Sequence, residues 1–434
     1  MVLQLCAVVP SGLSSLQTLN MANERDGDHT INSRADELPV LIIGSGSTGL
    51  ALAQGLRKAS VKCVVFEKHT PAIGERDWTM GCHWGAPVLK SLMPDDWWSR
   101  LQNVHADPHV APKELDTLTF VQGDNGKTIA AFPVPKFYRL RRSKLRELLS
   151  QELDIRYEKR LANVTFAEDE TSVTAHFSDG TTTTGSMLVG ADGARSTTRQ
   201  CLLAPQLGSV NRIPYCATFV EGKFSKEQAL YLRSFHPLYL ATAHPENLFG
   251  FFATQAVEDP EDPTSWTFKF YISWQSSLDE QEATAHWTDA QRLAQQKEFA
   301  KKFCDPWKSA YEWMPDDTPV WYMGMTEWDP GVEGHRWNNH NGLITLVGDA
   351  AHPMTCQRGQ GLNHSLTDAG QVRDALVKIR DGADRKQVIT EYEDGMIERT
   401  GGEVRDCTKN TSLLHDWEKV KQSLFYAKGM TKNH

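Results

Sequence analysis

The stretch LIIGSGSTG, residues 41–49, decides the fold of this chain. Its apolar residues end a predicted strand, and its glycines have the spacing G-x-G-x-x-G ahead of a predicted helix, Leu50 to Ala59. A second apolar strand, residues 61–66, ends at Glu67, about 20 residues beyond the glycines, as a dinucleotide-binding turn requires. The glycines let a pyrophosphate approach the helix N-terminus, and the carboxylate can accept hydrogen bonds from a ribose. The candidate ligand residues here are Gly44, Gly46, Ser47, Thr48, Gly49, Glu67 and Lys68.

A second glycine-rich turn begins GDAAHP and spans residues 348–363. It follows an apolar strand, Leu343 to Val347, and opens a predicted helix near Leu362. A strand that stops at an aspartate and turns through glycines brings a carboxylate and free backbone N–H groups together, where they can hold a polyhydroxylated, anionic ligand. The candidates in this turn are Asp349, Gly359, Gly361, Leu362 and Asn363.

A third turn with glycine and aspartate lies between these two along the chain. Residues 161–190 alternate apolar and polar positions and lead to a buried strand, Met187 to Val189. The sequence then reads GADGARSTTR, residues 190–199, ahead of a predicted helix. A basic helix start at Arg142 either reaches a phosphate or belongs to a solvated face. The candidates in the third turn are Asp192, Gly193 and Arg199.

Composition argues against several classes of function. The net charge of −9 and the lack of a basic stripe argue against nucleic acid as a partner. The eight cysteines contain no C-x-x-C pair and no zinc-ligand spacing, which predicts reduced thiols and no metal site. Residues 1–37 lack a signal-peptide pattern and are expected to form a disordered extension, and no apolar run approaches the roughly 18 residues of a membrane span. We therefore expect a soluble, intracellular protein in the cytoplasm.

The region from residue 206 to 335 differs in character from the segments on either side. An apolar stripe alternates there with polar positions, which is typical of a strand with one apolar face. The stripe consists of Trp266, Phe268, Phe270, Ile272 and Trp274. We expect an antiparallel sheet that walls a pocket for an apolar substrate. The alternative is that the stripe faces the protein core.

Two other regions complete the chain. A tryptophan-rich connection, residues 67–135, is predicted to pack over the first domain, with Arg76 and Trp84 as weaker ligand candidates. After residue 361 the pattern predicts helices at residues 362–379, 385–399 and 413–425. Three further residues are pocket candidates that also fit packing roles, and they are His83, Tyr215 and Arg358.

Taken together, the three turns resemble those of the FAD-dependent aromatic-hydroxylase type of monooxygenase, the family that includes para-hydroxybenzoate hydroxylase, in its fungal natural-product branch. The resemblance covers residues 38–200 and 340–400. It implies an α/β protein: a Rossmann-type FAD-binding domain with an inserted antiparallel-sheet substrate domain and a helical C-terminal region. The implied boundaries are residues 38–205 and 336–400 for the FAD-binding domain, 206–335 for the substrate domain and 401–434 for the C-terminal helical segment.

The resemblance also assigns roles to individual residues. In that family the first turn holds the FAD pyrophosphate, the late aspartate holds the ribityl chain, and the middle motif serves both FAD and NAD(P)H. These roles fall here to Gly44, Gly46 and Gly49 with Glu67, then to Asp349, then to Asp192, Gly193 and Arg199, while an R-x-x-L element falls on Arg142 and Leu145. Cys356 departs from the family, which usually has a proline there that stiffens the loop facing the flavin.

The activity implied by the resemblance is that of a monooxygenase with non-covalent FAD and a transiently bound NAD(P)H. One oxygen atom of O2 would pass from a C4a-(hydro)peroxyflavin to an aromatic or polyketide- or alkaloid-like small molecule, by hydroxylation or epoxidation, in secondary metabolite biosynthesis. Two alternatives stay open: a flavoenzyme of the same fold that dehydrogenates or cyclises without inserting oxygen, and a non-catalytic flavin-binding protein. No pattern predicts a side-chain nucleophile, so no catalytic residue is assigned. The sequence also does not identify the substrate or the oligomeric state.

Overall fold

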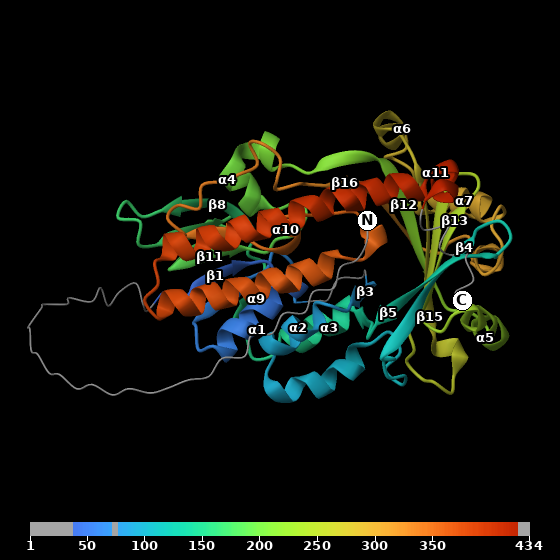
Figure 1. Cartoon of the computed structure of the whole chain (residues 1–434), viewed down its shortest axis with the longest axis horizontal. Helices are drawn as coiled ribbons and strands as arrows, with labels where there is room; N and C mark the ends of the chain where they lie inside the picture. The colour runs from blue at the N-terminus through green and yellow to red at the C-terminus, as the bar shows by residue number, and fades with distance from the viewer. Residues whose placement is uncertain (1–37, 72–76, 424–434) are drawn as a thin grey trace, which may run out of the picture.

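The computed structural model describes residues 38–71 and 77–423 of the 434 residues in the chain (Figure 1). The extension expected at residues 1–37, the ligand candidate Arg76 and the last residues of the helix expected at 413–425 lie outside the described residues. Two large sheets and two small ones form the described part, with long helices between them. None of the helices within it is long and apolar enough to cross a membrane.

A five-stranded parallel sheet organises one half of the molecule. Its strands, in spatial order, are β17 (Ile344–Leu346), β11 (Met187–Gly190), β1 (Val40–Ile43), β2 (Cys63–Phe66) and β7 (Ile155–Arg156). Ile43 pairs with Gly190, and Gly190 pairs with Leu346, so three neighbouring strands end at one level. Because the strands are parallel, the three glycine turns that follow them lie at one edge of the sheet.

Apolar side chains from both faces of this sheet are buried, as parallel strands require. One face, with Val40, Ile42 and Val65, packs against helices, and the other, with Leu41 and Ile43, packs against a small antiparallel sheet. The helices are α1 (Ser47–Lys58), α2 (Ala86–Leu92), α3 (Arg142–Leu149), α9 (Gly361–Arg380) and α10 (Arg385–Leu414). The small sheet consists of β8 (Leu161–Phe166), β9 (Val173–Phe177) and β10 (Thr182–Gly185), with α4 (Thr197–Gly208) beside it.

A seven-stranded sheet forms the other half of the molecule (Figure 1). In spatial order it contains β16 (Val320–Glu327), β12 (Asn211–Gly222), β15 (Thr267–Gln275), β14 (Leu248–Ala256), β13 (Tyr239–His244), β4 (Leu115–Gln122) and β5 (Thr128–Pro135). All neighbours are antiparallel except β13 and β4, which are parallel. Strands β4 and β5 lie within residues 38–205, the segment expected to bind FAD. They nevertheless belong to the seven-stranded sheet, because β4 pairs with β13.

The rest of the tryptophan-rich connection does pack over the parallel-sheet half. β3 (Thr79–Cys82) pairs antiparallel with β6 (Tyr138–Arg141), and the 3-10 helix η1 (Asp95–Val104) supplies Trp97 and Leu101 to the core of that half. The remaining elements are α5 (Lys226–Phe235), η2 (Pro263–Ser265), α6 (Leu278–Ala283), α7 (Asp289–Ala300), α8 (Trp307–Trp313), η3 (Gly348–Ala350), η4 (Cys356–Arg358) and α11 (Trp417–Gln422).

Strand β15 buries the apolar stripe away from the parallel-sheet half. Phe268, Phe270 and Ile272 have no exposed surface and share a core with side chains of α7 and α8, such as Leu293 and Trp307. The side chains between them, Lys269 and Tyr271, point to the opposite face. The expectation that the apolar stripe walls a substrate pocket is therefore wrong for these three residues, and the core alternative holds. Which face of β15 is buried in the core depends on the helices that cover it. The alternation of residues along the strand does not predict where those helices lie.

Helix α10 connects the two halves (Figure 1). It runs without interruption from Arg385 to Leu414, beyond the expected end at Arg399 and across the expected domain boundary at residue 400. At its far end the His415 Nε2 lies 2.8 Å from Ser273 Oγ on β15, and Leu414 packs into a core of the seven-stranded sheet. The expected boundary at residue 400 therefore falls inside a continuous helix.

Exchanging one residue on each face of β15 tests the assignment of its faces. Phe268→Ala is expected to lower the free energy of unfolding by about 3–5 kcal/mol, because it opens a cavity in a closed core. Tyr271→Phe keeps its ring and is expected to lower it by no more than about 1.5 kcal/mol, the value of one hydrogen bond. Urea unfolding of the flavin-free protein measures both values, and equal losses would contradict the assignment.

Candidate active site

Three glycine turns meet at the carboxyl ends of β1, β11 and β17. Ala191 N donates to Ile43 O at 2.8 Å, and Val347 N donates to Gly190 O at 2.9 Å, so each turn is hydrogen-bonded to the strand beside it. Gly44 has φ of +110°, and a Cβ at this position would lie 2.4 Å from Ala191 O. Only glycine permits this conformation and this approach, so the turn at residues 44–49 and the middle turn at residues 190–199 are held in direct backbone contact.

The glycines of the turns fall into two groups. A Cβ on Gly49 would lie 2.1 Å from Gly44 O, so this glycine lets the chain pack against itself. A Cβ on Gly46, Gly193 or Gly359 would meet nothing within 4 Å, so these three border open space. The second group therefore borders open space at the edge of the sheet, and we refer to this space as the groove.

The N-terminus of α1 faces this groove with unsatisfied donors. Its N-cap, Gly46, provides no side-chain cap, and the first turn of the helix has no acidic residue. The Ser47 hydroxyl is buried and has no hydrogen-bond partner. Thr48 lies behind it, where its Oγ1 would be 2.8 Å from a Cβ on Gly348. A helix N-terminus with free N–H groups and a free hydroxyl is an anion site.

Glu67 lies at the end of β2 as a buried acceptor. Its Oε2 accepts from Ser45 N at 3.0 Å and from Ser45 Oγ at 2.7 Å, and its Oε1 accepts from His69 N at 3.0 Å. Burial raises the pKa of Glu67, but the hydrogen bonds from Ser45 and His69 and the charge of Arg146 outweigh it and lower the pKa below its usual value. The group is thus a carboxylate with acceptor capacity left for a hydroxyl. Lys68 beside it is exposed.

Arg142 and Asp349 lie close enough to interact electrostatically. The Arg142 guanidinium lies over the Trp78 ring, 4.4 Å from its centroid, and interacts electrostatically with Glu67 and Asp349. Burial raises the pKa of Asp349, partly offset by His352, Arg142 and Arg199. The Asp349 carboxylate is nevertheless exposed and accepts no hydrogen bond from another residue of the described chain. Such a group, deep in the protein but open on one side, is available to a ligand with hydroxyl groups.

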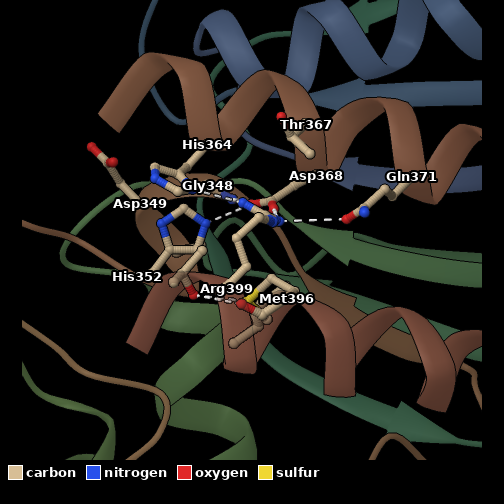
Figure 2. Close-up of polar contacts among 12 residues, drawn as sticks. Gly348, Asp349, His352, His364, Thr367, Asp368, Gln371, Met396 and Arg399 are labelled. Atoms are coloured by element: carbon tan, nitrogen blue, oxygen red, sulfur yellow. Dashed lines mark hydrogen bonds and ion pairs between the residues drawn. The ribbon is translucent and has the colours of Figure 1, made fainter. Parts of the chain in front are cut away.

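A buried polar network holds the Gly348–Asp349 turn from behind (Figure 2). Asp368 on α9 accepts from Gly348 N at 2.7 Å, from His352 Nε2 at 2.6 Å and from Arg399 of α10 at 2.5 Å. Burial raises the pKa of Asp368, but His352 and Arg399 outweigh it and lower the pKa. Figure 2 shows Asp349 pointing away from this network. Sequence reasoning missed it, because its members come from three separate elements and no spacing connects them.

The middle turn supports the site mainly through its side chains. Asp192 accepts from Ser196 Oγ at 2.5 Å and from Thr198 N at 3.0 Å, which fixes the start of α4. Arg199 has no exposed surface and donates to Gly208 O at 2.8 Å and to Ala350 O at 2.7 Å. A side chain without exposed surface cannot contact a ligand. Instead of the expected contact with FAD or NAD(P)H, Arg199 forms a bridge between the middle turn and the late turn.

Asn363 has a similar supporting position. It is fully buried, and its Oδ1 accepts from His83 N at 3.0 Å and from Gly85 N at 3.1 Å, which ties the tryptophan-rich connection to α9. Gly359 is exposed, and Gly361 and Leu362 are partly exposed at the uncapped N-terminus of α9. Of the residues expected in this turn, Asn363 supports the loop, while Gly359, Gly361 and Leu362 border the groove.

The remaining candidates divide between the site and the rest of the molecule. His83 stacks on Phe137, and Trp84 donates to Gln360 Oε1 at 2.9 Å, so both lie beside the α9 turn. Tyr215 packs against His415 with ring centroids 5.0 Å apart, and Arg358 pairs with Glu403 at 2.9 Å. Tyr215 and Arg358 therefore have structural partners.

An aromatic wall lies where the seven-stranded sheet faces the groove. It consists of Trp78, Phe219, Trp321, Tyr271 and Phe251, whose consecutive ring centroids are 4.7–5.6 Å apart in the pairs Trp78–Trp321, Trp321–Phe219, Phe219–Tyr271 and Tyr271–Phe251. Tyr271 forms a hydrogen bond with Cys356 of the late turn, and Trp78 carries Arg142, so the wall adjoins the groove. Sequence reasoning missed this wall because its five residues belong to five separate segments of the chain.

Comparison with known proteins agrees with this geometry. A family model described as an FAD binding domain matches residues 37–85 and 105–400. The chain belongs to this family.

Its relatives are FAD-dependent monooxygenases of fungi. The FAD-dependent monooxygenase phnB of Penicillium herquei is 34% identical over 396 residues, which cover 90% of this chain and 94% of phnB. The FAD-dependent monooxygenase cctM of Talaromyces islandicus is 32% identical over 394 residues, 90% of this chain and 96% of cctM. The chain is thus an FAD-dependent monooxygenase by family.

Solved structures show the same fold at low identity. Klebsiella pneumoniae HpxO, complexed with FAD and uric acid, superimposes with a TM-score of 0.70 at 17% identity, covering 91% of this chain and 93% of HpxO. The 2,6-dihydroxypyridine-3-hydroxylase of Arthrobacter nicotinovorans gives a TM-score of 0.68 at 15% identity, over 88% of this chain and 93% of that enzyme. The expected α/β fold with an FAD-binding domain is confirmed.

The groove fits FAD by three independent features. Open space at Gly46 and the partnerless Ser47 hydroxyl suit a pyrophosphate, the Glu67 carboxylate suits a ribose diol, and the exposed Asp349 carboxylate suits a polyhydroxylated chain. These features follow one another along the sheet edge in the order in which FAD carries the groups they suit.

Two glycine variants separate cofactor binding from folding. Gly46→Ala adds a methyl group in open space and is expected to leave the urea midpoint of the flavin-free protein unchanged while reducing FAD affinity at least about tenfold, since it fills the place of a phosphate. Gly49→Ala is the matched control and is expected to destabilise the flavin-free protein by about 1–3 kcal/mol, because its Cβ would overlap Gly44 O. Full FAD affinity in Gly46→Ala would show that the cofactor does not pass this position.

Asp349→Ala is expected to weaken FAD binding about ten- to a hundredfold, which corresponds to one or two hydrogen bonds to a charged group. The pKa of Asp349 is raised in the folded protein, so the destabilisation by the ionised group develops as the pH rises from the unfolded-state pKa to the folded-state pKa, and it stays constant at higher pH. The flavin-free variant is therefore expected to be as stable as the unmodified protein at pH 7, or more so. Fluorescence titration with FAD and urea unfolding measure the two effects. Loss of folding even with excess FAD would give Asp349 a purely structural role.

Proposed function

We propose that this protein is an FAD- and NAD(P)H-dependent monooxygenase that inserts one oxygen atom of O2 into an aromatic or polyketide- or alkaloid-like small molecule in secondary metabolism. The reaction is a hydroxylation or an epoxidation. The observation that carries the proposal is the junction of the FAD groove with the aromatic wall, where Tyr271 meets Cys356 and Arg142 lies on Trp78. The candidate cofactor site and an aromatic surface adjoin there.

The cofactor would be held non-covalently along the groove. Gly44, Gly46, Ser47, Thr48 and Gly49 would surround the pyrophosphate, and the further contacts would come from Glu67, Lys68, Arg142, Gly193, Asp349, Gly359, Gly361 and Leu362. When bound, FAD would accept a hydride from NAD(P)H and activate O2, so that one oxygen atom enters the substrate and the other leaves as water. We infer that NAD(P)H binds transiently, because the sequence has no second nicotinamide fingerprint.

The protein itself contributes charge compensation and exclusion of water. The N-terminus of α9, a 20-residue helix without a side-chain cap, offers backbone donors and a positive dipole end to negative charge near Gly361. The aromatic wall offers apolar surface to a flat substrate and keeps water from the reacting atoms. We assign no side chain a proton-transfer or nucleophilic role. We also propose that the protein is located in the cytoplasm, as its sequence predicts.

Incubation of the FAD-loaded protein with a fungal metabolite extract, NADPH or NADH, and O2 tests the proposal. The expected result is oxidation of the nicotinamide with equal O2 consumption and a product heavier than its substrate by one oxygen atom, seen by mass spectrometry. A product lighter by two hydrogens, or an isomeric ring, would support the alternative of oxidation or cyclisation without oxygen insertion. FAD binding without any substrate-dependent oxidation would support a non-catalytic flavin-binding protein.

A further inference from the structure

Ser45 lies between the first two glycines of the first turn, Gly44 and Gly46. It is only 2% exposed, and its side chain is directed at Glu67, at the end of the neighbouring strand β2. The Ser45 hydroxyl donates to Glu67 Oε2 at 2.7 Å, and the Ser45 backbone N–H donates to the same oxygen at 3.0 Å. One residue therefore supplies two donors to one oxygen of the carboxylate that suits the FAD ribose.

The Glu67 carboxylate has about four acceptor positions, two on each oxygen. The two donors of Ser45 occupy both positions on Oε2, and His69 N occupies one position on Oε1 at 3.0 Å. No further group among residues 38–71 and 77–423 donates to this carboxylate. One position is left, on Oε1, beside the exposed residues 68–70. A ribose diol has two hydroxyl groups, so only one of them can be accepted while Ser45 keeps its contacts.

Arg146 of α3 holds Ser45 in this orientation. Its Nε donates to Ser45 O at 2.9 Å, and its Nη2 donates to Ser45 Oγ at 3.2 Å. A hydroxyl group has one hydrogen, and because its oxygen accepts from Arg146, the hydrogen is directed at Glu67. Hydrogen bonds with a charged partner are roughly twice as strong as neutral ones, and both bonds of this hydroxyl have one. The chain of contacts from Arg146 through Ser45 to Glu67 is therefore firm.

Two other cations of α3 differ from Arg146. Arg142 lies four residues earlier on the same helix face, but its guanidinium lies over a tryptophan ring, 4.4 Å from the centroid. Lys144 lies on another face and pairs with Glu147 at 2.9 Å, where both side chains are largely exposed. Of these three cations, Arg146 is the one that donates hydrogen bonds to Ser45.

We propose that Arg146 and Ser45 are positioning residues for the cofactor: they keep Oε2 of Glu67 occupied, so that this carboxylate binds a single hydroxyl group of the FAD adenosine ribose. The hydroxyl group accepted by Oε1 holds the adenosine, and the other hydroxyl group adds no bond to Glu67. The inference rests on the FAD site and is independent of the oxidation proposed above. Neither Arg146 nor Ser45 takes part in electron or oxygen transfer.

Titration of the full-length flavin-free protein with FAD and with two analogues tests the proposal in the absence of NAD(P)H. One analogue lacks the 2′-hydroxyl group of the adenosine ribose, and the other lacks the 3′-hydroxyl group. Loss of the hydroxyl group that Glu67 accepts is expected to weaken binding about ten- to a hundredfold, the value of one hydrogen bond to a charged group, and loss of the other by no more than about threefold. Quenching of flavin fluorescence measures the dissociation constants.

Variants then show whether Ser45 and Arg146 cause this difference. Ser45→Ala vacates one position on Glu67 Oε2, so both hydroxyl groups are expected to contribute, and each analogue is expected to bind at least about fivefold more weakly than FAD. Arg146→Met frees the Ser45 hydroxyl and is expected to change the pattern in the same direction. Lys144→Met is the matched control, because it removes a cation of α3 that does not contact Ser45, and it is expected to keep the single-hydroxyl pattern.

The proposal is overturned if both analogues bind the unmodified protein about equally weakly, since Glu67 then accepts both hydroxyl groups, or if both bind as tightly as FAD, since it then accepts neither. It is also overturned if a folded Ser45→Ala variant keeps the pattern of the unmodified protein. The comparison of the two analogues needs no variant, so it decides the question even where a variant does not fold. A protein that shows the single-hydroxyl pattern but inserts no oxygen would refute the proposed reaction and support this inference.

Discussion

The parallel pairing of β1, β11 and β17 is the constraint on which the site depends. Each strand ends at the same level, and the backbone bonds Ala191 N to Ile43 O and Val347 N to Gly190 O carry the pairing into the turns. Turns that are about 150 residues apart along the chain thereby share one groove. The close approach of Gly44 to Ala191 O depends on the same register, because a shift of one residue would reverse the direction of every side chain.

Buried charges make this arrangement rigid from behind. Arg199 joins the middle turn to Ala350, and Asp368 joins the Gly348 amide to His352 and Arg399. Breaking a buried pair by removing one partner costs about 3–5 kcal/mol, so each of these groups holds its neighbours firmly. The exposed Asp349 and the partnerless Ser47 hydroxyl lie in front of this buried network.

Local motifs could be predicted from the sequence, and contacts between distant segments could not. The turn at residues 41–49, Glu67 and the Gly348–Asp349 turn lie where the spacing predicted them, because a strand, a turn and a helix that are adjacent in sequence specify their own geometry. The pairing of β4 with β13 depends on an edge supplied by residues more than a hundred positions away, and no local pattern carries it. Period-2 alternation on β15 predicted two faces, but the helices that cover one of them decide which face is core.

The roles of charged residues show the same division. The sequence is compatible with two roles for Arg142, a phosphate contact and a place on a solvated helix face. In the structure its guanidinium lies over Trp78 and interacts electrostatically with Glu67 and Asp349. Arg199 matched a motif, yet it is completely buried, since burial depends on how α4, Trp328 and the late turn surround it.

The crystal structure of the protein grown with FAD tests the central claim most directly. The account predicts electron density for one FAD along the edge of the parallel sheet, with the ribose within hydrogen-bond distance of Glu67, the pyrophosphate over Gly46 and the ribityl chain at Asp349. The flavin ring would then lie between α9 and the aromatic wall. FAD bound elsewhere, or bound with Glu67 and Asp349 out of reach of its hydroxyl groups, would contradict the account.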